Sequence, residues 1–235
     1  MRNISAVTSE AAAQKPARKR PKGEETRARI LAAALDLFRE QGFEAATMRD
    51  IAVKSGVATG AAYYYFDSKD AIVLAFYDQA QREMDPLLEQ ALAGSKDLKE
   101  RVRRILDVKF RYFEPSRRLL GALAAHTDPA HALSPFGPRT QPIRENDIRF
   151  FAQAIAGSRT RVPEDLETYL PRLLWMYQMG LILFWIYDRS PEQRRTAALV
   201  DKSLYVIIRL IQLAGLPLMR PVRRLVRELM DTVTE

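Results

Sequence analysis

Apolar residues recur at helical spacing along most of this chain. Between residues 24 and 43, Ile30, Ala34 and Phe38 lie four positions apart, which is typical of a helix with one buried face. The same spacing returns over residues 98–113. Alternation of apolar and polar positions, which a half-buried strand would need, appears nowhere in the sequence. The pattern therefore predicts an all-α fold.

Two short helices follow the first one. Thr47 is a favoured N-cap residue, and Asp50, three positions later, completes the pattern of a capping box. Gly56 supplies a tight turn, and a third helix is expected over residues 58–66. This order of helices is that of a helix-turn-helix motif, whose second member enters the major groove of DNA.

The rest of the chain also predicts helices. Ser68 is the expected N-cap of a fourth helix that reaches toward Pro86, and four prolines make residues 127–142 a loop or short-helix region. Further helices are expected near residues 143–156, 164–188, 191–213 and 219–232. We therefore divide the chain into an arm (1–22), a helix-turn-helix domain (23–70) and a larger helical domain (71–235).

The segment around residues 42–70 resembles the TetR family of bacterial transcriptional regulators. The matching positions are Gly42, Phe43, Thr47, Arg49, Ile51, Ala52, Gly56, Val57, Gly60, Tyr63, Phe66, Lys69 and Asp70. Ala58 and Thr59 depart from the pattern, because a pair such as Ser-Lys is common there, and Asp67 stands where proline is common. The resemblance implies a DNA-binding head and a variable all-α domain that binds a small molecule and dimerises.

A helical wheel of the third helix suggests how this head would read DNA. Phe66 belongs to the small core of the head, whereas Tyr63 and Tyr64 face away from it. Small residues at Gly60 and Ala61 would let the backbone approach the groove floor. We expect bases to be read by Arg49, Thr59, Tyr63 and Tyr64, and phosphates to be held by Thr47, Tyr65 and Lys69.

The larger domain offers candidates for a ligand pocket and a dimer interface. Aromatic side chains and isolated polar groups often line small-molecule pockets. The candidate wall consists of Phe110, Tyr112, Phe113, His126, Trp175, Gln178 and Met179. The dimer is expected to form through the helices near 164–188 and 191–213. His126, Asp128 and His131 lie close together in "HTDPAH", but Pro129 prevents a regular helical pair of histidines, so we expect no metal site there.

Charge and composition narrow these hypotheses only partly. The formal net charge is +8, yet residues 26–77 carry six basic and six acidic side chains. The basic stretch "KPARKRPK" is either a solvated tail or an arm that follows DNA. The chain has no cysteine, so no zinc-thiolate site or disulfide can form. The apolar run 173–187 would span about 22 Å as a helix, which is too short for a bilayer core of about 30 Å.

Three other classes of protein fit the sequence less well. An enzyme would need a nucleophile or phosphate-binding loop of which the sequence gives no sign, and a membrane-associated protein would need a longer apolar helix. A helical ligand carrier without DNA binding would not need the pattern over residues 47–69. We therefore expect a cytoplasmic, ligand-responsive regulator, a repressor by the family default, that binds a palindromic operator as a dimer, needs no cofactor and is not an enzyme.

Overall fold

The computed structural model describes residues 22–234. The arm predicted for residues 1–22 therefore lies outside the described part, except for Lys22, which begins the first helix. All regular elements over residues 22–234 are helices, and this confirms the all-α prediction.

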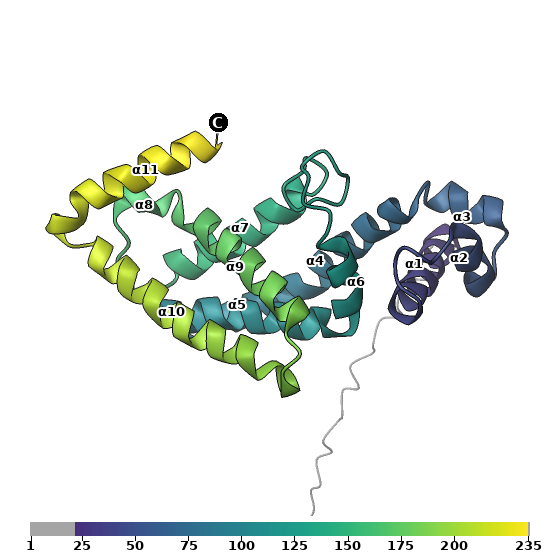
Figure 1. The fold of residues 1–235 in the computed structure, drawn as a ribbon, viewed down its shortest axis with the longest axis horizontal. Helices are drawn as coiled ribbons and strands as arrows, with labels where there is room; N and C mark the ends of the chain where they lie inside the picture. Colours follow the sequence, from purple (N-terminus) through teal and green to yellow (C-terminus); the bar gives the residue numbers. More distant parts are fainter. Residues whose placement is uncertain (1–21, 235) are drawn as a thin grey trace, which may run out of the picture.

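A small head occupies one end of the molecule (Figure 1). It consists of α1 (Lys22–Glu40), α2 (Met48–Ser55) and α3 (Thr59–Tyr65). Each helix contributes buried apolar side chains to a shared core, which we call the head core. Its central members include Ile30, Leu35, Phe38, Ile51, Ala62 and Phe66, and Val57 packs against it. The predicted place of Phe66 in this core is thus confirmed.

Helix α4 (Lys69–Ala93) connects the head to the larger body (Figure 1). The sequence predicts that this helix ends near Pro86, and that prediction was wrong, because the helix continues for two more turns. A proline removes one backbone hydrogen bond but does not have to end a helix that is held by packing. Met84 and Leu88, on either side of Pro86, are almost fully buried in the body and hold the helix together.

Over the described residues, the body contains seven further α-helices. They are α5 (Leu98–Phe113), α6 (Arg117–Leu123), α7 (Gln141–Ala156), α8 (Glu164–Glu167), α9 (Leu170–Tyr187), α10 (Arg194–Ala214) and α11 (Arg220–Thr234). Short 3-10 turns at Glu114–Ser116, Pro191–Gln193 and Pro217–Met219 precede α6, α10 and α11. The apolar pattern alone did not delimit α6, which contributes Leu119 and Leu123 to the head core and thereby joins head and body.

One predicted helix is split in two. The expected helix over residues 164–188 is interrupted between Glu167 and Leu170, because Pro171 follows closely. In a continuous helix the ring of Pro171 would clash with the carbonyl of Glu167, four residues earlier. At the second position of α9 the proline is tolerated, since the first backbone amides of a helix have no partner within it.

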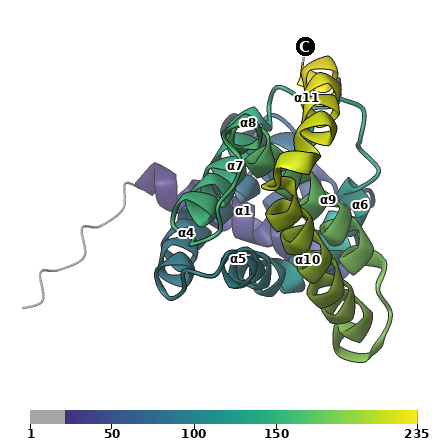
Figure 2. The same ribbon diagram turned by 90° about the vertical axis from the view of Figure 1, so that its left-hand side faces the viewer.

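Helices α10 and α11 form the outer side of the body. Helix α10 runs beside α5, and α11 turns back over α8 at the end farthest from the head (Figure 1). The view from that end shows α11 extending beyond the other helices (Figure 2). The Arg223 guanidinium holds α11 on α8 through Asp165, with Nε 2.8 Å from Oδ2. Within residues 22–234 no helix is long and apolar enough to cross a membrane.

Candidate nucleic-acid interface and ligand cavity

The start of α2 is fixed by the capping box that the sequence predicts. The backbone amide of Asp50 donates to Thr47 Oγ1 at 3.1 Å, and the amide of Thr47 donates to Asp50 Oδ2 at 3.0 Å. Hydrogen bonds from the Thr47 side chain and backbone also lower the pKa of the Asp50 carboxyl. These bonds satisfy two otherwise unpaired amides, so the first turn of α2, which carries the exposed Arg49, is held in place.

The turn between α2 and α3 depends on Gly56. This residue has φ of 67° and ψ of 36°, a left-handed conformation that side chains disfavour. The amide of Val57 then donates to the carbonyl of Ala52 at 3.0 Å, which closes the end of α2. The turn sets the angle between the helices and leaves one side of α3 facing solvent.

The residues of α3 that are predicted to face DNA bases lie on that exposed side. Tyr63 is 51% exposed and Tyr64 is 83% exposed, which is unusual for such large aromatic side chains. Thr59 and Gly60 are also exposed, and Ala61 is half-buried. A methyl group built on Gly60 would meet no other atom within 4 Å, so nothing in the free protein requires a glycine there.

Tyr65 marks the edge of this surface. It is half-buried, its ring lies edge-on to Tyr64 at 5.2 Å, and its hydroxyl lies 3.7 Å from the position of a methyl group built on Gly23. Tyr65 therefore lies between α3 and the start of α1, where a hydroxyl can reach a DNA phosphate. Its phosphate contact stays a prediction.

Lys69 is engaged within the head itself. Its ammonium donates to the backbone carbonyls of Phe43 at 2.7 Å and Glu44 at 3.2 Å and lies 4.6 Å from the centre of the Phe43 ring. These contacts tie the start of α4 to the turn between α1 and α2. An ammonium has three donors, so a phosphate contact remains a prediction, but Lys69 also acts as a brace that the sequence did not indicate.

Arg27 is a further basic residue of the head that was not predicted to contact DNA. This exposed residue of α1 places its guanidinium 4.6 Å from the centre of the Phe66 ring, next to the end of α3. Arg27 adds a positive charge beside a reading helix that has none of its own. Arg27 follows Gly23 by four positions, so the two residues lie on the same side of α1. The Tyr65 hydroxyl lies near Gly23, and this helical spacing is the signal that could have indicated Arg27.

The body contains an apolar cavity of about 410 Å³ between α4, α5, α6, α7 and α9. Five of the predicted pocket residues line it: Phe110, Phe113, Trp175, Gln178 and Met179. Tyr112 and His126 are not among the lining residues. Tyr112 instead donates a hydrogen bond of 2.6 Å to Glu83. A cavity of this size and character can hold a small organic molecule.

A buried polar cluster forms part of the cavity wall. The Lys109 ammonium lies 2.6 Å from Asp147 Oδ1, and the Gln178 amide donates to Asp147 Oδ2 at 2.8 Å. The side chains of Lys109 and Asp147 are 5% and 12% exposed, so water screens their attraction only weakly. The pair neutralises its own charge, and the cavity keeps an interior without an unpaired carboxylate.

The two histidines of the loop before α7 stack on each other. The rings of His126 and His131 lie 4.0 Å apart and nearly parallel, and His131 Nδ1 accepts a hydrogen bond from the amide of Leu133 at 3.1 Å. Over residues 22–234 there is no group of three or more His, Cys, Asp or Glu side chains arranged to hold a metal ion. The stacking and the bond to Leu133 hold His131 in the loop, whereas Nε2 of His126 is buried without a hydrogen-bond partner.

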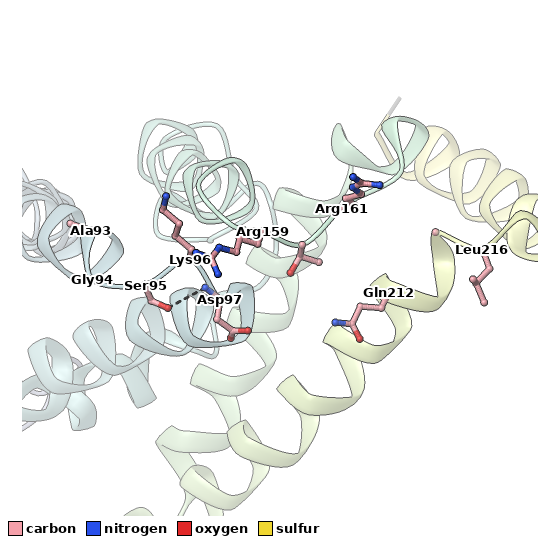
Figure 3. Close-up of a pocket in the computed structure, with 11 residues that line it drawn as sticks. Ala93, Gly94, Ser95, Lys96, Asp97, Arg159, Arg161, Gln212 and Leu216 are labelled. Carbon is pink, nitrogen blue, oxygen red and sulfur yellow. Dashed lines mark hydrogen bonds between the residues drawn. The ribbon is translucent and has the colours of Figure 1, made fainter.

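A second hollow lies where α5 begins, close to the junction of α10 and α11 (Figure 3). Its volume is about 860 Å³, and Lys96, Arg159 and Arg161 stand around it with exposed side chains. An apolar molecule bound there would remove water from these charged groups without offering them a hydrogen bond, which is unfavourable. The apolar cavity near Trp175 is therefore the better candidate for a ligand site.

Comparisons with known proteins agree with this geometry. Residues 30–76 match the family described as bacterial regulatory proteins of the tetR family, and residues 101–231 match the tetracyclin repressor-like C-terminal domain. The chain is 44% identical over 72 residues to a helix-turn-helix transcriptional repressor of Mycobacterium tuberculosis, covering 30% of this chain but only 38% of that protein. The similarity to this relative is thus confined to part of its length.

Solved structures cover more of the chain. The structure of NalD, the secondary repressor of the MexAB-OprM multidrug efflux pump in Pseudomonas aeruginosa, superposes with a TM-score of 0.58 at 25% identity, covering 79% of this chain and 96% of NalD. A TetR regulator from Nitrosomonas europaea, at 18% identity and a TM-score of 0.59, covers 77% of this chain and 97% of its own and shares the fold. The match to the C-terminal family model alone spans more than half of the residues of this chain. The chain therefore belongs to the TetR family of bacterial regulatory proteins.

Proposed function

We propose that this protein is a transcriptional repressor that binds a palindromic DNA operator as a homodimer and releases it when a small, mostly apolar molecule binds the body. The observation that carries the proposal is the exposed face of α3, with Tyr63 and Tyr64 turned to solvent. Large apolar side chains at the surface of a head that small mark a binding surface. The names of the M. tuberculosis repressor and of NalD support repression. This role would place the protein in the bacterial cytoplasm.

Within this proposal, α3 lies in the major groove and the flanking groups hold the DNA backbone. Arg49 and the two tyrosines reach base edges, while Arg27, Tyr65 and the spare donor of Lys69 contact phosphates. Residues 26–77 carry six basic and six acidic side chains, so affinity depends on these few groups rather than on bulk charge. Two heads spaced by about one turn of DNA would read the two halves of the operator.

The coupling between ligand and DNA would run through two helices. Helix α4 connects the head directly to the cavity wall, and α6 lies between the cavity and the head core. In addition, Arg118 of α6 donates to the carbonyl of Glu40, at the end of α1, at 3.2 Å. A molecule that changes the packing of α4 or α6 would shift the heads. By linkage, such a molecule must bind the DNA complex less tightly by the factor by which it weakens DNA binding.

The alternative is a helical ligand carrier without a DNA-binding role. A carrier needs the cavity, but its function does not require the exposed tyrosines of α3 or the helix-turn-helix arrangement of α2 and α3. The test is a gel-shift titration of a palindromic fragment from the upstream region of the protein's own gene. Arg49→Ala combined with Tyr64→Ala should weaken binding by about 100-fold, since two base contacts of about 1–3 kcal/mol each are lost.

The matched control is Arg111→Ala, which removes an exposed arginine from α5 in the body. It should leave the affinity within about twofold of the wild type, because Arg111 is far from α3 in the sequence and belongs to the body. Equal affinity and equal sequence preference in the double variant and the wild type would refute the proposed reading surface. Binding that depends on salt but not on the palindrome would argue for a nonspecific attraction instead.

A further inference from the structure

The hydroxyl of Tyr77 is a polar group that the packing of the protein leaves unused. Tyr77 belongs to α4 and lines the cavity, and its hydroxyl finds no hydrogen-bond partner among residues 22–234. Two other tyrosines of the body are paired, Tyr112 with Glu83 and Tyr177 with Ser203, each at 2.6 Å. Burial raises the pKa of the Tyr77 phenol, so the group stays protonated and keeps a hydrogen to donate.

Three other donors of the cavity wall are already bonded to backbone carbonyls, whereas Gln178 Oε1, an acceptor, has no hydrogen-bond partner. Gln81 donates to the carbonyl of Ile143 at 3.0 Å, and Thr140 donates to the carbonyl of Gly137 at 3.2 Å. Arg144 donates to the carbonyl of Pro135 at 2.7 Å. A molecule that accepts a hydrogen bond from Gln81, Thr140 or Arg144 would compete with the carbonyl that each donor already binds, whereas a bond from Tyr77 breaks none.

The charges of the wall favour a neutral occupant. Lys109 and Asp147 neutralise each other at 2.6 Å, so neither offers an unpaired charge to a bound molecule. The Arg144 guanidinium is tied to loop carbonyls and lies 5.8 Å from the Trp175 ring. A cation entering this cavity would lose its hydration without gaining a free carboxylate, and an anion would have to compete with two backbone carbonyls for the guanidinium of Arg144. Aromatic walls from α5 and α9 instead suit a flat, apolar body.

Tyr77 also touches the head. Its ring packs against the head core, and the neighbouring Phe76 is one of the buried members of that core. Phe76 in turn lies edge-on to Phe113, whose side chain lines the cavity, with 5.9 Å between the ring centres. A bond to the Tyr77 hydroxyl would therefore act on α4 at the level where head and cavity meet.

We propose that the effector is a neutral molecule with an aromatic body and a hydrogen-bond acceptor, and that this acceptor binds the hydroxyl of Tyr77. The inference rests on the proposed function in one respect, namely that the cavity holds the effector. It adds the chemical class of that effector and the residue that distinguishes it from a purely apolar molecule.

Three probes with the same naphthalene body test the inference. 2-Acetylnaphthalene carries a neutral acceptor, 2-ethylnaphthalene carries none, and 2-naphthoate carries a negative charge. Both tryptophans of the chain, Trp175 and Trp185, line the cavity, so quenching of tryptophan fluorescence reports binding. We expect 2-acetylnaphthalene to bind about three- to tenfold more tightly than 2-ethylnaphthalene, as one added neutral hydrogen bond allows, and 2-naphthoate to bind most weakly.

Tyr77→Phe removes only the hydroxyl and should abolish the preference for the acetyl probe while leaving the affinity for 2-ethylnaphthalene unchanged. Tyr112→Phe, the matched control, removes a phenol that is bonded outside the cavity and should keep the preference. A preference that survives in Tyr77→Phe, tighter binding of 2-naphthoate, or no binding of any probe would overturn the inference. These titrations contain no DNA, so a wild type that fails to bind a palindrome would refute the proposed function without affecting this result.

Discussion

At position 60 the stability of the free protein would favour alanine, whereas the proposed contact with DNA favours the glycine that is present. Glycine in a helix costs up to about 1 kcal/mol relative to alanine, and the space around Gly60 is open. The free protein would therefore gain from an alanine at this position. The proposed explanation for the glycine is the close approach of the α3 backbone to the groove floor.

Gly60→Ala separates these two effects. We expect the free energy of unfolding in urea to stay the same or rise by up to about 1 kcal/mol, because helix propensity improves. Operator affinity in a gel shift should fall at least about tenfold, because a methyl group would hold the backbone away from the bases. If the variant is more stable and binds DNA as well as the wild type, the helix does not approach the groove through Gly60.

Single residues also show what the sequence can and cannot predict about the site. The capping box at Thr47 and the burial of Phe66 follow from local chemistry and helical spacing, and both were predicted. The direction of the Lys69 ammonium was not, because it depends on where the turn with Phe43 and Glu44 lies in three dimensions. The long side chain can reach solvent or those carbonyls equally well, and only the packed structure decides.

Among the elements of the body, the ends of α4 and α7 share one unusual cap. Arg101 of α5 is only 7% exposed, and its guanidinium donates to the carbonyls of Ser95 at 2.7 Å, Gln153 at 2.8 Å and Ala154 at 2.8 Å. These carbonyls belong to the C-terminal ends of the two helices or follow them directly, where the helix dipole favours a positive charge. Burial lowers the pKa of this guanidinium, as expected for a cation without a carboxylate partner.

Arg101→Met should therefore destabilise the body strongly. Several buried carbonyls would lose their hydrogen bonds at once, which we expect to cost roughly 3 kcal/mol or more in urea unfolding. Arg104→Met is the matched control on the same helix, because Arg104 is half-exposed and its main partner is Glu100. A change below about 1 kcal/mol is expected there. An equal loss of unfolding free energy in the two variants would show that the buried Arg101 stabilises the body no more than an exposed arginine does.

Arg101 also shows why elements are easier to predict than the contacts between them. The helical spacing of α5 places Leu98, Val102 and Ile105 on a buried side, and the structure agrees. The same wheel does not foretell that an arginine beside them will be buried, since its partners come from α4 and α7. The continuation of α4 past Pro86 has the same origin, because packing from other parts of the chain outweighs the local preference of a proline.

For the molecule as a whole, the sequence predicts the class of fold and the head in detail but the ligand site only in part. Five of the seven proposed pocket residues line the cavity. Tyr77, which the further inference depends on, was missed, because it lies on the helix that also carries the head. Its proposed role depends on the position of α4 between the head core and the body, and no local sequence pattern predicts that position.

Exposed apolar side chains lie on α9 and α10, and we call them the apolar stripe. Phe184 and Tyr187 are exposed on α9, and Val206 and Leu210 are exposed on α10. Several large apolar side chains exposed on two neighbouring helices are typical of an interface between subunits. Symmetric pairing of the two helices with those of a second copy would cover it and would fix the distance between the two heads. The dimer itself remains part of our proposal.

Leu210→Glu should therefore break the dimer and, with it, operator binding. A charge placed in an apolar interface is costly when it is buried without a partner, so we expect the variant to sediment as a monomer at micromolar concentration. Its circular dichroism should keep the helical signal of the wild type, because Leu210 is 56% exposed within one subunit. Affinity for the full palindrome should fall by at least about 100-fold, since each head alone holds only half of the contacts.

Leu87→Glu is the matched control, because Leu87 is 47% exposed on α4, outside the stripe. That variant should remain a dimer that binds DNA. A dimeric Leu210→Glu protein would place the interface elsewhere, and a monomer with undiminished affinity would show that one head suffices.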